Sequence, residues 1–498
     1  MNAEISPLSG HSVAPTPRTQ PRRIAIVGGG CTGLRLALLF KKWNECATQD
    51  NQVEVVVFEA RPHAGGFLQS NKGSSGVLVE SGAQGVLASR TVFLQALEEA
   101  GMTPADVIAA PRSGPRAARY LISPTGQLAR LSPFLLLRSG LSAPGDLLRL
   151  ALEIFKARPV RPPHPDESLY QFFSRHFGRI WAENFVLPFA TGIWGGGAEK
   201  LLLRHTFPQL QEIEIRRGSL IRTALLSILS RFVGGRKKAL PGTHDWPKGL
   251  LSFPGGMHTL IEKMRATLEN SGPWQSLRLN APVHSLQQTA EKKYLINGNE
   301  TFDFVFWTSG PWNSPELEFG HSDMKREWEL LQNTPTHTFI VVNVSGKRSH
   351  LTRDGFGVLA RRESTGLLGV LFVHSIYQQH VPEDTFSYRV LLGGDRNPAM
   401  ISWSDEQLTE YTLIELKKLN LLDLPQEQCT IEVIRWNRAI AIADLGHDGR
   451  MATLWRLQAH MPGLRFAGIY KKGVGVADAL LSAQETFDDW VSALRPNP

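Results

Sequence analysis

The sequence predicts an α/β protein in which a parallel sheet, covered by helices, is built from segments that lie far apart in the chain. The segment RRIAIVGGGCTGLRLALLF (22–40) contains a short buried-strand pattern, a glycine-rich turn and an apolar helical pattern. The segment VEVVVFEA (53–60) reads as a second buried strand. Near the other end, GLRFAGIY (463–470) reads as a strand and is followed by glycine and a helix. Because the first two strands need further neighbours, we expect both ends of the chain to share one sheet.

The length and composition are typical of a large soluble protein rather than a disordered or membrane-spanning one. The 498 residues exceed what one hydrophobic core usually supports, so we expect two or three domains. Hydrophobic residues make up 42% of the chain and charged residues 20%. The excess of 54 Lys and Arg over 46 Asp and Glu is modest for this length, so no nucleic-acid partner is expected. Cys31, Cys46 and Cys429 form no C-x-x-C pair, which favours a reduced compartment and no metal site.

The first 21 residues differ in composition from the rest of the chain. They are rich in Ser, Pro and Thr and contain no apolar core segment, so residues 1–21 are predicted to be a disordered N-terminal extension and not a secretory signal. No run of about 18 uncharged apolar residues occurs anywhere, which argues against a transmembrane helix. The nearest candidate, residues 132–163, is interrupted by Arg138, Asp146 and Arg149. We therefore expect a cytoplasmic protein.

The first glycine run has the spacing of a dinucleotide-binding turn. In G-x-G-x-x-G, Gly28 makes the turn, Gly30 lets the backbone approach a pyrophosphate, and Gly33 allows the helix to pack closely on the strand. The second strand ends in Glu59, which is placed to accept hydrogen bonds from a ribose hydroxyl and disfavours a 2′-phosphate. These features predict a Rossmann-type domain, and NAD and FAD both suit the turn. The alternative is a glycine-tolerant loop in an enzyme without a nucleotide.

The residues after Glu59 favour FAD. The segment EARPHAGGFLQS (59–70) contains a second glycine pair and resembles the second motif of the amine-oxidase-like class of FAD enzymes. Four further segments follow in one order: LVESGAQGVLASR (78–90), the long segment 167–214, GLLSFPGGMHTLIEKM (249–264) and RFAGIYKKGVGVADALLSAQE (465–485). With LLGGDRNP (391–398) and IRWNRAIAIADLGH (434–447), they resemble the oxygen-dependent protoporphyrinogen oxidase and coproporphyrinogen III oxidase family of haem synthesis. The resemblance covers nearly the whole chain from Ile24.

The family resemblance implies a fold of three domains. These are a FAD-binding domain of the p-hydroxybenzoate-hydroxylase type, an α+β substrate domain and a mostly helical membrane-binding domain. The FAD-binding domain is then assembled from three discontinuous segments, at 22–89, 231–300 and 431–498. Between them, a substrate segment and the helical domain are expected at 90–230, and the substrate-binding domain is expected at 301–430.

The family resemblance also assigns FAD contacts to particular positions. They are the pyrophosphate turn, the ribose strand end, the second glycine pair with its aromatic residue, a glycine-containing loop near the flavin, an adenine contact, and a turn before the last helix. The last turn is expected to stabilise negative charge on the reduced flavin. The residues are Gly28, Gly29, Gly30, Cys31, Thr32, Gly33, Glu59, Ala60, Arg61, Gly66, Phe67, Gly82, Ala83, Gln84, Gly85, Val283, Ile469, Val474, Gly475 and Val476. Ala83 stands where the family usually has proline.

Four positions are expected to contact the substrate. Arg119 matches the arginine with which the family holds a propionate, although a solvated arginine at a strand edge has the same pattern, and Arg90 is a weaker second candidate. Leu359 and Phe372 match two strands that sandwich the macrocycle, and each would equally suit a plain core. Gly192 is expected at the pocket wall, where a missing side chain leaves room for a flat ring. No catalytic side chain is assigned, because the flavin carries the chemistry.

The implied activity is FAD-dependent oxidation of protoporphyrinogen IX to protoporphyrin IX, with dioxygen as acceptor and hydrogen peroxide as by-product. Coproporphyrinogen III oxidation is the closest alternative, and a non-catalytic flavin-bound porphyrin carrier is a third. An amine oxidase or a carotenoid desaturase would share the FAD motifs but not the segment 167–214. The family also implies peripheral membrane contact. A homodimer and transfer of product to a ferrochelatase stay open.

Two segments carry separate expectations. Residues 144–159 place apolar side chains along one broad helical face with basic residues beside it, which suits a membrane surface or burial against the protein's own domain. The second glycine run, Gly195 to Gly197, follows no buried strand and no ribose carboxylate follows it. We therefore predict that this run is not a phosphate cradle.

Overall fold

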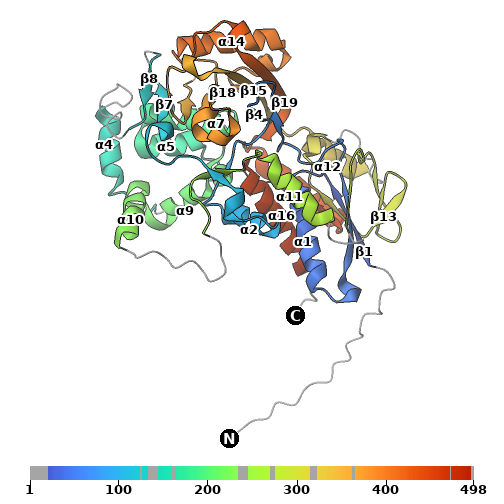
Figure 1. The fold of residues 1–498 in the computed structure, drawn as a ribbon. Coiled ribbons are helices and arrows are strands. Elements are labelled where there is room, and N and C mark those ends of the chain that lie inside the picture. The colour runs from blue at the N-terminus through green and yellow to red at the C-terminus, as the bar shows by residue number, and fades with distance from the viewer. Residues whose placement is uncertain are drawn as a thin grey trace.

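The described strands form two main sheets, which lie at opposite ends of the molecule (Figure 1). The structure is a computed structural model, and it describes residues 21–123, 126–132, 144–159, 164–233, 245–269, 275–313, 322–361, 365–471 and 473–494. Of the predicted disordered extension, only Pro21 is among the described residues. Residues 133–143, part of the apolar candidate segment 132–163, also lie outside the described residues.

The first sheet is parallel and contains both ends of the chain, as predicted. Its order is β10-β2-β1-β14-β20, and every neighbouring pair is parallel. Apart from β10, the strands are mainly apolar because both faces of the sheet pack against other elements of the protein. The C-terminal strand reaches β1 through β14, which lies between them. The strands are β1 (Arg22–Val27), β2 (Val53–Phe58), β10 (Gln275–Arg278), β14 (Phe304–Trp307) and β20 (Leu464–Phe466).

Helices from the beginning, middle and end of the chain pack on this sheet. The ring of Phe40 in α1 meets the rings of Phe306, Phe487 and Trp490 edge to face, with centroids 5.0–5.2 Å apart. This cluster joins the first helix to the last one, so the two ends of the chain share one core. The helices are α1 (Cys31–Cys46), α2 (Thr91–Glu99), α11 (His258–Glu269) and α16 (Val476–Leu494).

The second sheet is mixed and has the order β19-β15-β18-β17-β16-β7-β8. Its pairs are antiparallel except for β16 and β7. One face packs against α14 (Asp405–Lys418), which lies over the sheet in Figure 1 and buries alternate residues of the strands. The strands are β7 (Arg119–Ile122), β8 (Leu128–Arg130), β15 (Thr336–Lys347), β16 (Gly357–Leu359), β17 (Gly369–Phe372), β18 (Thr385–Gly393) and β19 (Thr430–Ala441).

Two segments cross the domain boundaries expected from the sequence. β14 belongs to the first sheet although it lies inside the expected substrate-binding segment 301–430. β19 belongs to the second sheet although nearly all of it lies inside the expected FAD-binding segment 431–498. The residue types of these two strands do not distinguish between the sheets, and only the hydrogen-bonded neighbours of each strand decide where it lies. The boundaries at 301 and 431 therefore do not separate the sheets.

The remaining described elements are small sheets and a helical region. The short strands are β3 (Ser70–Lys72) with β4 (Leu78–Glu80), β5 (Val86–Leu87) with β9 (Leu250–Ser252) and β6 (Ile108–Ala109), and β11 (Leu286–Gln288) with β12 (Tyr294–Ile296) and β13 (Glu300–Phe302). The helical region contains α4 (Pro144–Glu153), α5 (Leu169–Phe177), α6 (Arg179–Trp181), α7 (Leu187–Trp194), α8 (Leu203–Thr206), α9 (Pro208–Arg217) and α10 (Leu220–Val233). Elsewhere lie α12 (Ser322–Gln332), α13 (Val373–Ile376) and α15 (His447–His460).

A buried ionic network holds the helical region together. His176 is almost fully buried, with Nδ1 3.0 Å from the Glu153 carboxylate and Nε2 3.1 Å from that of Glu214. Arg175 donates to the Glu214 carboxylate at 2.9 Å. Burial disfavours the charged form of Glu214, but the hydrogen bonds from Arg175 and His176 keep the pKa of this carboxyl well below its usual range. Glu153 also accepts from the Ser219 hydroxyl at 2.7 Å. These contacts tie α4 and α10 to α5 and α9.

A pair of histidines joins the helical region to α15. The ring centroid of His447, whose side chain is buried, lies 4.4 Å from that of His205 in α8. His205 Nε2 lies 2.7 Å from an Asp448 carboxylate oxygen. Burial above all, with the nearby charge of His205, lowers the pKa of His447 to about 4. His447 is therefore neutral in the folded protein at neutral pH.

Because the unfolded chain binds a proton at His447 more readily than the folded one, stability is expected to fall as the pH drops from about 6.5 to about 4. The contribution of this group across that window is about 3 kcal/mol. Urea unfolding at about pH 7.5 and at about pH 5 should show a smaller acid loss for His447→Gln than for the parent protein. His460→Gln, at the exposed end of the same helix, is the matched control, and an equal acid loss in the parent and His447→Gln would contradict the assignment.

Candidate active site

The first glycine run forms a tight turn between β1 and α1. Gly28 has φ +112° and donates its N–H to the carbonyl of Phe58 at 2.8 Å. A Cβ at Gly33 would lie 1.9 Å from the carbonyl oxygen of Gly28, so no larger residue fits there. Helix α1 begins directly after Gly30, and no side chain of the described residues caps its N-terminus. Cys31 and Thr32 form its buried first turn. The amides of that turn are therefore free to bind an anion.

Glu59 lies at the end of β2, beside the turn. Its carboxylate accepts the N–H of Gly29 at 2.8 Å and the N–H of Arg61 at 2.9 Å. The side chain is buried at this sheet edge. Ala60 and Arg61 follow on the surface. The carboxylate is thus fixed next to the glycine turn, where a ribose of a bound dinucleotide would lie.

The second glycine pair lies flat against the first turn. The N–H of Gly65 donates to the carbonyl of Gly29 at 2.9 Å, and Gly30 forms a parallel bridge with Gly65. A Cβ built at Gly30 would meet only the Cα of Gly66, at 3.9 Å, and one built at Gly66 would meet only the Cα of Gly30, at 3.5 Å. Among the described residues, no side chain therefore fills the space that these glycines face. This cradle at an uncapped helix N-terminus fits a diphosphate.

The segment with Val283 lies beside the strand end that carries Glu59. The N–H of Asn280 donates to the carbonyl of Arg61 at 3.0 Å, and the N–H of Ala281 donates to that of Glu59 at 2.8 Å. Val283 itself is half-buried. The structure therefore brings the predicted adenine contact next to the predicted ribose contact, although the two are far apart in the chain.

The loop from Gly82 to Gly85 lies between the two sheets. A Cβ at Gly82 would lie 2.0 Å from the carbonyl oxygen of Phe67, and the Phe67 ring packs on Trp436 of β19 with ring centroids 4.6 Å apart. Ala83 packs against the core of the first sheet, and Gln84 is buried. The predicted glycine loop thus contacts the predicted aromatic position on one side and the second sheet on the other.

The turn before α16 is hydrogen-bonded within the chain. The N–H groups of Val474 and Gly475 donate to Asp478 Oδ2 at 3.2 and 3.0 Å. The Asp478 carboxylate also forms an ion pair with Arg90, the weaker candidate for a substrate contact. The guanidinium of Arg90 therefore lies at the N-terminus of α16. Ile469 and Val476 are half-buried on either side of the turn.

Three of the four predicted substrate contacts lie together. In the second sheet Arg119 pairs with Gly357, two residues before Leu359, so the side chains of Arg119 and Leu359 are on the same face. A Cβ at Gly192 of α7 would lie 4.0 Å from Leu359 Cδ2. The guanidinium of Arg119 is exposed and lies 4.5 Å from the centre of the Phe356 ring. Helix α7 and this sheet face therefore form two apolar walls that are in contact at Gly192 and Leu359, and Arg119 lies on the same sheet face.

Phe372 lies on the opposite face, which corrects the expectation that it contacts the substrate. It pairs with Tyr388, has no exposed surface and packs between the sheet and α14. Its neighbour Leu371 pairs with Arg389 and is on the face with Leu359. Because side chains alternate along a strand, a shift of one residue exchanges the core and the cavity wall. The alternation in GVLF could have indicated Leu371 instead.

The second glycine run packs α7 against the second sheet. Gly195 ends α7 with φ +77°, and a Cβ at Gly196 would lie 2.5 Å from Asp395 Cγ and 2.8 Å from His337 Cε1. The N–H of Gly197 donates to Asp395 Oδ2 at 2.6 Å. These glycines therefore serve close helix–sheet packing, and the carboxylate at their amides leaves no room for a phosphate. The prediction that this run is not a phosphate cradle is confirmed.

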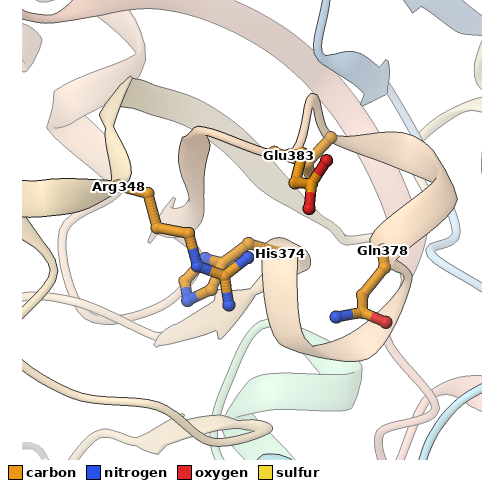
Figure 2. Close-up of a pocket in the computed structure, with 5 residues that line it drawn as sticks. Arg348, His374, Gln378 and Glu383 are labelled. Carbon is orange, nitrogen blue, oxygen red and sulfur yellow. The ribbon is translucent and has the colours of Figure 1, made fainter.

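A cavity of about 250 Å³ lies elsewhere on the second sheet (Figure 2). It is lined by Arg348, His374, Gln378, Val381 and Glu383, none of which the sequence predicts as a site residue. It is smaller than the roughly 300–1,000 Å³ of cavities that enclose drug-sized ligands, so it is not the site of a large flat substrate.

Across the described residues, no three His, Cys, Asp or Glu side chains are arranged to hold a metal ion.

The parallel sheet, its glycine cradle and the acidic strand end define a dinucleotide-binding protein. The chain belongs to the flavin containing amine oxidoreductase family, whose sequence pattern matches residues 36–486. It is an oxidoreductase, and its cofactor is FAD. The cradle described above fits that cofactor.

The relatives narrow the class further. The chain is 27% identical to the mitochondrial protoporphyrinogen oxidase of Nicotiana tabacum, over 95% of each chain. It is 25% identical to the coproporphyrinogen III oxidase of Staphylococcus aureus, over 95% of this chain and 100% of the relative. A crystal structure from Exiguobacterium sp. 255-15, provisionally assigned as a protoporphyrinogen oxidase, superposes with a TM-score of 0.75 at 19% identity, over 95% of this chain and 99% of that one. The last comparison shows the fold alone.

Because a Cβ at Gly33 would overlap the carbonyl of Gly28, Gly33→Ala is expected to abolish FAD binding. The measurement is the amount of flavin released per protein after denaturation of the purified variant. Gly449→Ala is the matched control, since a Cβ at that helical position meets nothing within 4 Å. Equal flavin content in both variants would contradict the assignment of the turn.

Proposed function

We propose that the protein oxidises protoporphyrinogen IX to protoporphyrin IX. Three two-electron oxidations remove six hydrogen atoms, and three molecules of dioxygen are reduced to hydrogen peroxide. The observation that carries this proposal is the apolar contact of Gly192 with Leu359 and the exposed cation Arg119 on the same sheet face. An apolar macrocycle with propionates at its rim suits such a site. The similarity to the tobacco enzyme over 95% of both chains supports the same substrate class.

The residues of the site have binding roles in this reaction. FAD, when bound, supplies the oxidising chemistry and passes the electrons to dioxygen. Arg119 would bind a propionate with two parallel hydrogen bonds and so fix the rotation of the ring in its plane. Leu359 and Gly192, which lie side by side, would form apolar surface against one part of the ring and help to hold it in line with the cofactor. Placement of this kind is the main contribution that the chain makes to the rate.

Coproporphyrinogen III is the second candidate substrate. The relative from Staphylococcus aureus that carries this name is matched over its whole length, at an identity close to that of the tobacco enzyme. The two substrates share the macrocycle and differ in the number of carboxylates at its rim. A comparison of turnover on both therefore distinguishes them.

Anaerobic titration of the holoenzyme with each porphyrinogen tests the proposed function. We expect protoporphyrinogen to bleach the visible flavin band, and Arg119→Ala to raise KM by roughly 10- to 100-fold with a smaller effect on kcat, because the lost contact binds substrate. Arg130→Ala is the matched control, since Arg130 pairs with Tyr120 on the next strand and so lies on the other face of the sheet. A flavin that stays oxidised while porphyrin binds would favour the carrier alternative and overturn the proposal.

We further propose that α4 and α10 lie on a membrane surface. In the described part of the chain, no helix is both long and apolar enough to span a bilayer. Several apolar side chains in these helices and in the turn after α4 are nevertheless exposed, among them Leu148 at 60% and Phe155 at 79%. The alternative expected for residues 144–159, burial against the protein's own domain, does not account for these exposed side chains. The exposed group is Leu148, Leu152, Phe155, Leu225, Leu226, Ile228 and Leu229.

Basic residues accompany this apolar surface. Arg158, Arg217 and Arg222 line a cavity of about 240 Å³ together with Thr223 and Leu226. Arg222 donates to the carbonyls of Ile154 and Lys156, so it also joins α10 to the end of α4. Apolar side chains beside arginines suit the boundary between acyl chains and anionic headgroups. A cytoplasmic location, a homodimer and handover to a ferrochelatase stay predictions from the family resemblance.

Flotation with vesicles containing anionic phospholipid tests the membrane proposal. We expect the parent protein to float, and the double variant Phe155→Ser with Leu226→Ser to bind at least about tenfold more weakly, because it removes two of the exposed apolar side chains. Leu330→Ser is the matched control, since Leu330 is 52% exposed on α12, away from this surface. A parent protein that stays at the bottom of the gradient would argue for an enzyme without membrane contact.

A further inference from the structure

Arg389 connects the second sheet to the loop between the two sheets. It lies in β18 and pairs with Leu371, so it is on the same face as Leu359. Its side chain is 5% exposed. One terminal nitrogen donates to the carbonyl of Gly82 and the other donates to Gln84 Oε1 at 3.0 Å. An arginine of the substrate sheet therefore binds two residues of the loop that the family places near the flavin.

A second side chain of the same sheet holds the preceding residue of the loop. Trp436 of β19 donates its Nε1–H to the carbonyl of Ser81 at 2.8 Å. Its ring packs on Phe67, whose carbonyl oxygen closely faces Gly82. Two consecutive carbonyls, of Ser81 and Gly82, are thus bound by donors from the second sheet. The position of the loop is set by that sheet as well as by the first one.

Burial of the charged Arg389 side chain lowers the stability of the folded protein, so stability does not explain why an arginine is present here. Burial lowers the pKa of its guanidinium to about 10, so the group is still a cation at neutral pH. Glu80, the acid that acts on it, is itself buried and accepts from Ser70 Oγ at 2.8 Å and from the N–H of Met257 at 2.7 Å. A buried cation bonded to neutral oxygens is less stable than an apolar side chain of similar size. What Arg389 provides, and an apolar side chain would not, is a set of directional hydrogen bonds to the loop.

We propose that Arg389 is a positioning residue for the flavin, which acts through the loop Gly82–Gly85 and sets the cofactor relative to the substrate face. The inference rests on the FAD assignment and on the proposed placement of this loop beside the flavin. A guanidinium suits the task because its rigid fork binds the Gly82 carbonyl and the Gln84 amide oxygen at once. A lysine ammonium has the same charge but no such fork.

The first test compares Arg389→Lys with Arg396→Lys as holoproteins without substrate. Arg396 follows the same strand and also donates to two backbone carbonyls, of Leu367 and Ala360, away from the loop. We expect Arg389→Lys to change the visible circular dichroism of the bound FAD and to release FAD roughly tenfold faster. We expect Arg396→Lys to change the Tm alone. Parent-like flavin dichroism and release in Arg389→Lys would overturn the proposal.

Trp436→Phe keeps the test decisive if the arginine variant fails to fold. It removes the N–H that binds Ser81 and leaves a smaller aromatic ring beside Phe67 and Arg61, so a smaller change of flavin dichroism in the same direction is expected. Unchanged dichroism and FAD release in this variant would overturn the proposal in that case.

Flavin dichroism and FAD release are measured without porphyrinogen. A parent enzyme that fails to oxidise porphyrinogen would therefore refute the proposed function, whereas these two measurements would still decide the role of Arg389. Where the parent is active, Arg389→Lys should lower kcat by roughly 10- to 100-fold at nearly unchanged KM.

Discussion

The close approach of two glycine-containing loops at one edge of the parallel sheet is the constraint on which the cofactor region depends. A side chain at Gly33 would overlap the carbonyl of Gly28, and side chains at Gly30 and Gly66 would fill the space that a diphosphate needs. β1 and β2 are parallel and adjacent, so their carboxyl ends deliver the glycine turn and Glu59 to the same place. The middle and the end of the chain then add strands and helices around this edge.

The second sheet is held to this edge by hydrogen bonds from side chains to backbone. Arg389 and Trp436 bind the loop at Gly82 and Ser81, and Asp395 binds the amide of Gly197 at the end of α7. Such bonds are directional, so they define the distance between the walls more tightly than apolar contacts alone. The same face that contacts the cofactor loop carries Leu359 and Arg119. In the proposed function, the substrate therefore binds to the same sheet face that holds this loop.

The chemistry assigned to the site explains why so few of its side chains are reactive. When the cofactor carries out the redox step, the chain has to bind, orient and exclude water. A single exposed arginine and two walls are sufficient for that. The helical region adds a different property, because its buried network around His176 holds two helices whose apolar side chains stay exposed. The helices of this region also share an apolar core that includes Phe172 and Trp194, so the exposed apolar side chains are not needed for internal packing.

The sequence by itself determined the class of fold, the glycine turn, the acid at Glu59 and the family, because these are local patterns whose residue types have few alternatives. It also indicated correctly that Gly195 to Gly197 are not a phosphate cradle. It did not reveal the partners of Arg389, or that Leu371 and not Phe372 shares a sheet face with Leu359, or which sheet contains β14 and β19. Those depend on strand neighbours and register, which are set by contacts between residues far apart in the chain and are decided only when both sheets pack.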